Sequence, residues 1–185
     1  AVRHAINCAI NKENVIEVAQ SGLGEVADSQ VPMTLLGASD ENADHYDVEK
    51  AKEWMEKSGV DPSTIELSIL CSNDARRRAA EVIQADLREI GIEATIESTD
   101  LATFFSLLTD GNFTGAIGGY NDSNLAMYLK GVYHTDSNKF RLTDPEIDAM
   151  IDDALTTVDQ NERETKLQKL CAVLNERCSI VPLWQ

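Results

Sequence analysis

Two hydrophobic periods alternate through the middle of the chain and indicate strands and helices in turn. From Ile65 to Cys71 every second residue is apolar, which is the pattern of a strand with one better-buried face. The segment that follows has apolar residues at helical spacing and stops at Gly91. Alternation of this kind favours an α/β fold, a layered sheet with right-handed crossovers between its strands. The predicted order is strand, helix, strand, helix and strand, over residues 65–71, 73–91, 92–98, 101–108 and 113–120.

Both flanks of this region are predicted to be largely helical. Residues 1–20 have the pattern of two helical pieces, with Asn11 breaking the first. Residues 21–46 contain glycines and a proline without a sustained period, and a segment of this length usually packs over a surface or lines a site. No repeat or composition break divides the chain, so one compact unit is expected. The other predicted elements are helices over 48–59, 143–158 and 161–178 and a short strand over 179–184.

The composition restricts the classes of partner. The 185 residues carry 16 basic and 32 acidic side chains, a formal net charge of −16. Such a field repels nucleic acid and anionic membrane surfaces, so we expect no nucleic-acid partner. No stretch approaches the roughly 20 apolar residues of a membrane helix. Because the opening residues have the pattern of a helix interior, we expect the chain to begin inside a longer protein.

Residues for metal binding or catalysis do not converge in the sequence. His4, His45 and His134 lie in different predicted elements, and we predict neither a metal site nor a cofactor. Motifs such as GxSxG or a phosphate-binding glycine loop are missing, so we predict that the chain is not an enzyme. The cysteines lack CxxC spacing, and packed thiols are favoured over a disulfide. They are Cys8, Cys71, Cys171 and Cys178.

A basic triplet, Arg76 to Arg78, stands out in this acidic chain. It falls in the first turn of a predicted helix, where cations meet an unfavourable helix dipole. A carboxylate ligand or an acidic neighbour would offset that cost. We favour pairing with surface acids.

Five consecutive blocks of the sequence resemble the family-5 extracellular solute-binding proteins, the peptide- and nickel-binding proteins of bacterial ABC transporters. The resemblance spans essentially the whole chain, and the blocks occur in the family's order. They are VRHAINCAINKENVI, YDVEKAKEWMEKSGV, RRRAAEVIQADLREIGIEATIES, FFSLLTDGNFTGAIGGY, and the stretch from NKFRLTDPEIDAM to SIVPLW.

This resemblance implies a type II periplasmic-binding-protein lobe, a layered sheet flanked by helices. Proteins of the family have two lobes around a cleft, and residues 1–185 correspond to a single ligand-binding lobe, the second, with the first lobe absent. The implied partners are a peptide or other small solute, the first lobe of the same protein and the ABC transporter permease. The implied location is the periplasm or the extracellular face of the membrane, with attachment through a lipid anchor absent from this chain.

The resemblance also suggests where a ligand binds. In open α/β sheets ligands bind beyond the carboxyl ends of the strands, and the third predicted strand ends at Tyr120. Family members commonly have an aromatic residue here that packs on the ligand, and peptide binders often follow it with an aspartate that pairs with the peptide's amino terminus. Tyr120 and Asp122 are therefore the first candidates, with Asn121 between them. Asn73 and Asp100 follow the other two strands and are equally plausible as helix caps.

Two departures from the family pattern leave the ligand open. Tyr120 replaces the usual tryptophan, and SNLAMY replaces the common continuation after the aspartate. A rim position for Tyr120 and a turn or cap role for Asp122 are the alternatives to ligand contact. We predict capture of oligopeptides or dipeptides, with only weak binding by one lobe alone. The alternatives are binding of nickel, haem or a sugar, the effector-binding domain of a transcription regulator, and a small hydrolase that uses Asp122.

Overall fold

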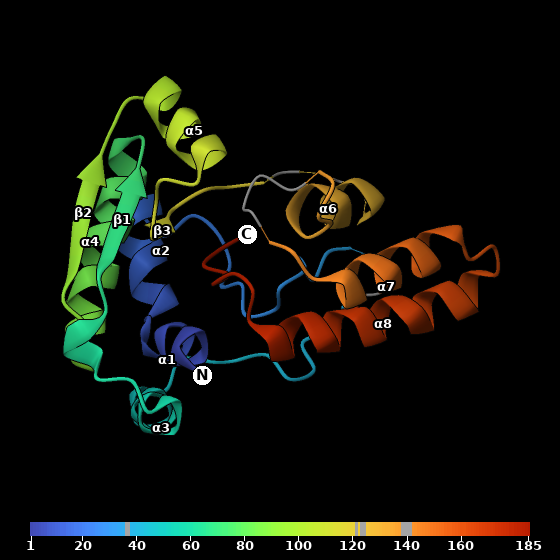
Figure 1. Ribbon diagram of the computed structural model, residues 1–185, viewed down its shortest axis with the longest axis horizontal. Helices are drawn as coiled ribbons and strands as arrows, with labels where there is room; N and C mark the ends of the chain where they lie inside the picture. The colour runs from blue at the N-terminus through green and yellow to red at the C-terminus, as the bar shows by residue number, and fades with distance from the viewer. Residues whose placement is uncertain (36–37, 121, 123–124, 138–141) are drawn as a thin grey trace. The chain divides into compact units, whose positions relative to one another are not determined.

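The computed structural model describes residues 1–35, 38–120, 122, 125–137 and 142–185 (Figure 1). Contacts between Cα atoms divide the chain into two compact units. Unit 1 comprises Ala1–Ala27, Asp44–Gly118 and Val181–Gln185, and unit 2 comprises Asp28–Ala43 and Gly119–Ile180. That residues 1–185 together form one ligand-binding lobe stays a prediction.

Unit 1 contains the predicted α/β alternation. Its parallel sheet has the order β2-β1-β3, with β1 (Leu67–Cys71) between β2 (Ala94–Ser98) and β3 (Gly115–Ala116). Helices α4 (Asp74–Arg88) and α5 (Leu101–Asp110) connect the strands. The unit also contains α1 (Val2–Ala9), α2 (Lys12–Gln20), α3 (Val48–Ser58) and the 3-10 turn η1 (Pro62–Thr64).

The central strand is buried because apolar groups cover both of its faces. Ile69 belongs to a core that includes the buried stripe of α4, with Ala79, Ile83 and Leu87. On the other face Leu70 packs with Phe104 and Leu108 of α5. A short parallel strand buried in this way is stabilised mainly by side-chain packing.

Two predicted strands are shorter than expected. β3 covers two residues instead of 113–120, and the pairing ends where Ile117 N donates to Leu70 O at 2.9 Å. Gly118 and Gly119 follow, and neither has a side chain to pack on a neighbouring strand. The strand predicted over 179–184 is reduced to a single antiparallel bridge between Trp184 and Val26. Pro182 lacks the N–H group that a longer ladder needs.

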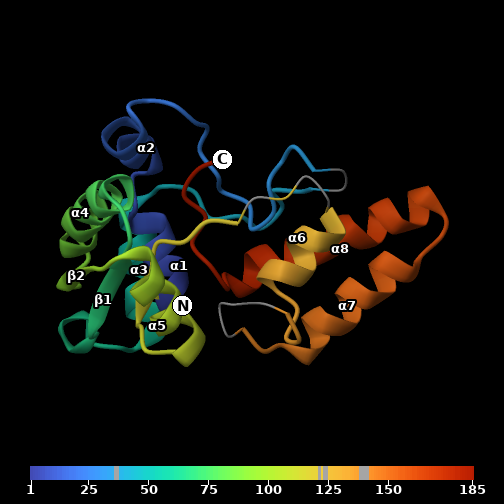
Figure 2. The same ribbon diagram turned by 90° about the horizontal axis from the view of Figure 1, so that it is seen from above.

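Unit 2 is a helical unit with its own core. It contains α6 (Leu125–Val132), α7 (Pro145–Thr156) and α8 (Gln160–Arg177). Figures 1 and 2 both show α7 and α8 running side by side. The sequence predicted α7 and α8 but not α6. The buried core of the unit includes Tyr128, Tyr133, Ile151, Leu170 and Leu174.

The part of the long irregular segment that belongs to unit 2 packs on the helices through buried polar groups. Asn175 of α8 accepts from Gln30 N at 2.8 Å and donates to Glu41 O at 2.8 Å. The Gln30 side chain in turn donates to Ile180 O at 2.8 Å and accepts from Ile180 N at 3.1 Å. Val31 is fully buried. The expectation that this segment packs over a surface is confirmed for these residues.

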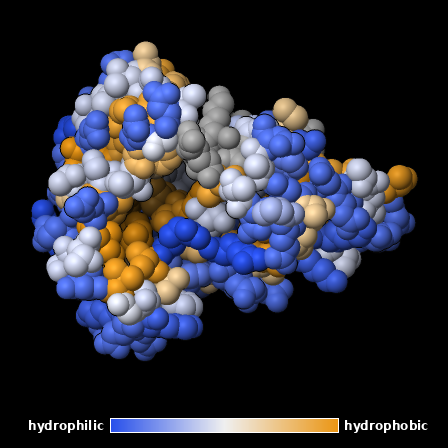
Figure 3. All heavy atoms as spheres, in the orientation of Figure 1, coloured by the Kyte–Doolittle hydropathy of each residue, from blue (hydrophilic) through white to orange (hydrophobic). Residues whose placement is uncertain are grey.

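The four cysteines are buried free thiols, as the sequence favoured. Among the helices in the described ranges, none has the length and apolar content required to cross a bilayer. The surface over α7 and α8 is largely hydrophilic in Figure 3, in keeping with the acidic composition.

Candidate functional site at the carboxyl edge of the sheet

Asn73 and Asp100 lie at the same edge of the sheet in unit 1. The register pairs Cys71 with Ser98, and each candidate follows its strand by two residues. Because the strands are parallel, their carboxyl ends meet at one edge. The structure therefore brings these two predicted residues together.

Both side chains cap the helix that follows. Asn73 Oδ1 accepts from Arg76 N at 2.8 Å at the start of α4. Asp100 Oδ1 accepts from Ala102 N at 2.9 Å and Thr103 N at 3.1 Å at the start of α5. The hydroxyl of Thr103 also donates to Asp100, and donation by this side chain and then by the Thr103 N–H lowers the pKa of the carboxyl. The cap role expected for each residue is confirmed, and ligand contact stays a prediction.

The three arginines of the basic triplet have different environments. Arg77 forms ion pairs with Glu81 at 2.5 Å and Asp74 at 3.8 Å on its own helix, as favoured for the triplet. Arg78 instead donates to Val18 O and Ala19 O, both at 3.2 Å, and so satisfies carbonyls in the last turn of α2. Sequence patterns gave no signal for that contact because α2 lies about 60 positions earlier.

Arg76 is the member of the triplet that lies close to the sheet edge. Its Nη1 donates to Ser72 Oγ at 2.7 Å, one residue after β1. Its guanidinium carbon lies 5.5 Å from the centre of the Phe104 ring, within the range of a cation–π contact. The side chain is half-buried. A guanidinium held by a hydroxyl and a ring keeps further N–H donors for a carboxylate or other anion.

Tyr120 and Asp122 belong to unit 2. The prediction that the third strand runs to Tyr120 is wrong, since β3 ends four residues earlier at Ala116. Tyr120 is 39% exposed, its hydroxyl donates to Met127 O at 3.1 Å, and its ring lies edge-on to Tyr128 with the centres 5.9 Å apart. Asp122 is partly buried, and Asn121 lies outside the described residues. The proposed ligand contacts of all three stay predictions.

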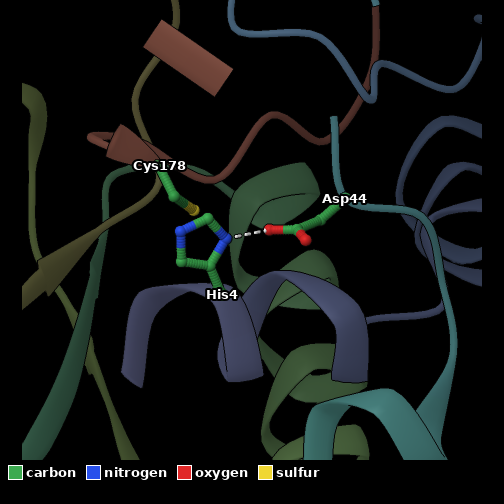
Figure 4. A group of neighbouring side chains, drawn as sticks. All are labelled: His4, Asp44 and Cys178. Atoms are coloured by element: carbon green, nitrogen blue, oxygen red, sulfur yellow. Dashed lines mark hydrogen bonds and ion pairs between the residues drawn. The ribbon is translucent and has the colours of Figure 1, made fainter. Parts of the chain in front are cut away.

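A histidine–aspartate pair in unit 1 was not foreseen. His4 Nδ1 lies 2.5 Å from Asp44 Oδ2, and Figure 4 shows the imidazole of α1 turned toward this carboxylate. Lys50 Nζ lies 3.6 Å from the other carboxylate oxygen, and the His4 ring stacks on Trp54 at 4.6 Å. The partners are 40 residues apart, so no local pattern connects them. The pair fastens the end of the irregular segment to α1.

A family model, "Bacterial extracellular solute-binding proteins, family 5 Middle", matches residues 1–139. The haem-binding protein A of Haemophilus influenzae is 28% identical over 98% of the chain. The nickel-binding periplasmic protein of Escherichia coli is 29% identical over 99% of the chain. Among solved structures, the putative peptide-binding protein AppA of Clostridium difficile has a TM-score of 0.86 and 25% identity over 98% of the chain.

The matches cover only part of each known protein. The chain spans 36% of the length of the haem-binding protein, 39% of the nickel-binding protein and 40% of the solved AppA chain. The proteins matched are named for what they bind.

Proposed function

The chain belongs to the bacterial extracellular solute-binding proteins of family 5, and from this we propose that it is the second lobe of the substrate-binding component of an ABC importer. The full-length protein captures its ligand between two lobes, the other lobe being the first lobe of the same protein, and delivers it to the permease. The ligand stabilises the closed arrangement because it contacts both lobes. The protein works in the periplasm or on the outer face of the cell membrane, held by a lipid anchor, and catalyses no reaction.

The ligand class that the charges support best is a dipeptide or short oligopeptide. A short peptide carries an ammonium group at one end and a carboxylate at the other. In unit 1, Arg76 at the sheet edge supplies a guanidinium for the carboxylate end of such a ligand. Independently, the family resemblance proposes Asp122 as the partner of an ammonium group. The half-buried position of Arg76, with donors left for an anion, is the observation that carries this proposal. Asn73 and Asp100 border the same edge of the sheet as Arg76.

Relatives with other ligands define the alternatives. The names of two relatives specify haem and nickel. A nickel site requires several nitrogen, oxygen or sulfur ligands around one ion, and haem requires an axial ligand and a large apolar pocket. The Arg76 guanidinium favours a ligand with an anionic group, such as the carboxylate end of a peptide, over a nickel cation. Nickel and haem become outcomes of the experiment below.

Isothermal titration calorimetry on the full-length protein tests the proposal. The ligands are a panel of dipeptides and tripeptides, nickel chloride and haemin. We expect one-to-one binding of a peptide, with affinity reduced about 10- to 100-fold by Arg76→Ala because a charge-assisted hydrogen bond is lost. The matched control is Arg88→Ala on the same helix, where an exposed arginine pairs with Glu93.

Three results would count against the proposal. Tight binding of nickel or haemin without peptide binding would overturn the peptide assignment. Failure of the folded protein to bind any member of the panel would overturn solute binding of these classes. Equal effects of the Arg76 and Arg88 substitutions would remove the role given to Arg76.

A further inference from the structure

The ring of Tyr120 lies directly against the backbone of α6 at Gly131. A Cβ atom added at Gly131 would lie 2.3 Å from both Cζ and the hydroxyl oxygen of Tyr120 and 2.6 Å from its Cε2. Atoms in folded proteins do not approach this closely without a shift of one partner. The absent side chain of Gly131 is therefore what makes room for the ring.

The backbone of α6 does not itself require glycine at this position. Gly131 is not among the glycines with positive φ, so its conformation is open to any residue. Within a helix, glycine is also less favourable than alanine because it loses more conformational freedom on folding. The contact with Tyr120 explains why position 131 is glycine although glycine destabilises a helix.

Two further contacts hold the ring in place, and one of the contacting residues is itself fixed in the core. The Tyr120 hydroxyl donates to Met127 O, one helical turn before Gly131. The ring meets Tyr128 edge-on, and the Tyr128 hydroxyl donates to Gln30 O at 3.1 Å. Tyr133 donates to the same carbonyl at 2.5 Å. The base on which Tyr120 rests is thus a buried, hydrogen-bonded part of the core of unit 2.

We propose that Gly131 is the positioning residue for Tyr120, and that α6 thereby presents a preformed aromatic surface to the ligand. The Tyr120 hydroxyl proton is used by Met127 O, so the exposed part of the ring is what remains for contact. A ring surface selects an apolar or planar group, so the ligand carries an apolar or aromatic side chain here. The prediction about the ligand's side chain, called the ligand clause below, rests on the proposed function. The packing of the Tyr120 ring against Gly131, called the seat of Tyr120, does not.

A double-mutant cycle in the full-length protein tests the seat. Gly131→Ala is made in the wild type and in the Tyr120→Ala background, and thermal unfolding is measured for all four proteins. We expect Gly131→Ala to lower the unfolding midpoint in the wild type. In the Tyr120→Ala background the same change leaves the midpoint unchanged or raises it, because alanine favours the helix once the ring is gone. Lys130→Ala, at the exposed neighbouring position of α6, is the control and shifts neither background.

Binding of two dipeptides then tests the ligand clause. Gly131→Ala is expected to weaken binding of a phenylalanine-containing dipeptide about fivefold, the scale of one aromatic contact, and to leave glycylglycine within about twofold. If Gly131→Ala changes the unfolding midpoint equally in the wild type and in the Tyr120→Ala background, the proposed packing of Tyr120 against Gly131 is overturned. Suppose that the double-mutant cycle gives the expected result but Gly131→Ala weakens binding of both dipeptides equally. The ligand clause would then be overturned, and the proposed function would still stand. Failure of the wild type to bind either dipeptide would count against both the peptide ligand and the clause, while the cycle would still decide the seat.

Discussion

Buried hydroxyl and thiol groups in unit 2 lose protons less readily than they would in water. Burial raises the pKa of Tyr128 from 10.0 to about 12 and that of Tyr133 well above 10.0, and it raises the pKa of Cys171 from 9.0 to about 11. In the unfolded chain these groups return to their ordinary values. Above about pH 9 the unfolded state therefore binds fewer protons than the folded state, so the free energy of unfolding falls as the pH rises.

Substitution of Tyr128 by phenylalanine tests this pH dependence. At pH 7 we expect a loss of about 1 kcal/mol in the free energy of unfolding, because the hydrogen bond to Gln30 O is lost while the ring is kept. Between pH 10 and 11.5 the variant loses stability less steeply than the wild type, because one group with a raised pKa has been removed. Chemical unfolding followed by circular dichroism at several pH values measures both effects. Tyr46→Phe at an exposed position is the control, and identical pH slopes for the wild type and Tyr128→Phe would contradict the account.

Local side-chain roles could be predicted from the sequence, and distant ones could not. Asp47, Asn73 and Asp100 cap helices whose first N–H groups lie two or three residues away, so sequence spacing alone indicates the role. The bonds of Arg78 to α2 and of His4 to Asp44 join residues 40 or more positions apart. Nothing in a local pattern specifies such a partner. The seat of Tyr120 on Gly131 also required coordinates, because a helical glycine gives no signal of what it faces.

At the scale of elements, the segments with a clear apolar period were predicted and α6 was not. The sequence indicated α4, α7 and α8, which have 15, 12 and 18 residues. It did not indicate α6, which has eight residues. A helix this short is marginal on its own and depends on tertiary packing, here the burial of Tyr128, Leu129 and Val132. The same dependence on packing explains why the third strand ends before Gly118 and Gly119.

The irregular segment in unit 2 is predicted to depend on one side chain of α8. Asn175 is buried and bonds to Gln30 N, Ser39 O and Glu41 O. Asn175→Ala would remove these bonds and leave the buried Gln30 N without this acceptor, whereas Ser39 O keeps the Ser29 hydroxyl at 2.8 Å. We expect a loss of about 3 kcal/mol in the free energy of unfolding, measured by denaturant titration.

The matched control for this prediction is Lys169→Ala, at an exposed position of the same helix. Its cost is expected to stay below about 0.5 kcal/mol. A loss of less than about 1 kcal/mol for Asn175→Ala would show that water replaces the side chain and that Asn175 does not hold the segment.

At the scale of the whole molecule, the α/β fold class and the family were predictable, and the division into two units was not. Unit 1 is assembled from three separate pieces of chain, and unit 2 from two. Because the chain passes between the units several times, no single linker or change in composition marks a boundary. The three strands and their two connecting helices all lie in one piece, Asp44–Gly118, which no crossing interrupts. The alternation of periods therefore predicted the order of these elements, although the third strand is shorter than expected.

The predicted contacts differ in how much the sequence itself supports them. Asn73 and Asp100 follow from the rule that parallel strands present their carboxyl ends together, and the register of β1 and β2 places them at one edge. Tyr120 and Asp122 follow from the resemblance to the family. The sequence indicated Arg76 only as one of three neighbouring arginines. The contacts in the structure were needed to show that Arg76, and not Arg77 or Arg78, lies at the sheet edge.

The central proposal is that Asp122 contacts the charged amino terminus of a peptide in the full-length protein. The most direct test is the affinity of the full-length protein for one dipeptide with a free or acetylated amino terminus. Calorimetric titrations of alanyl-phenylalanine and its N-acetyl form would compare the wild type with Asp122→Asn and with the exposed control Asp40→Asn. We predict that Asp122→Asn weakens binding of the free dipeptide about 10- to 100-fold, the worth of one charge-assisted hydrogen bond, and hardly changes binding of the acetylated form. Binding of the free dipeptide that is equally tight in the wild type and Asp122→Asn would contradict the account.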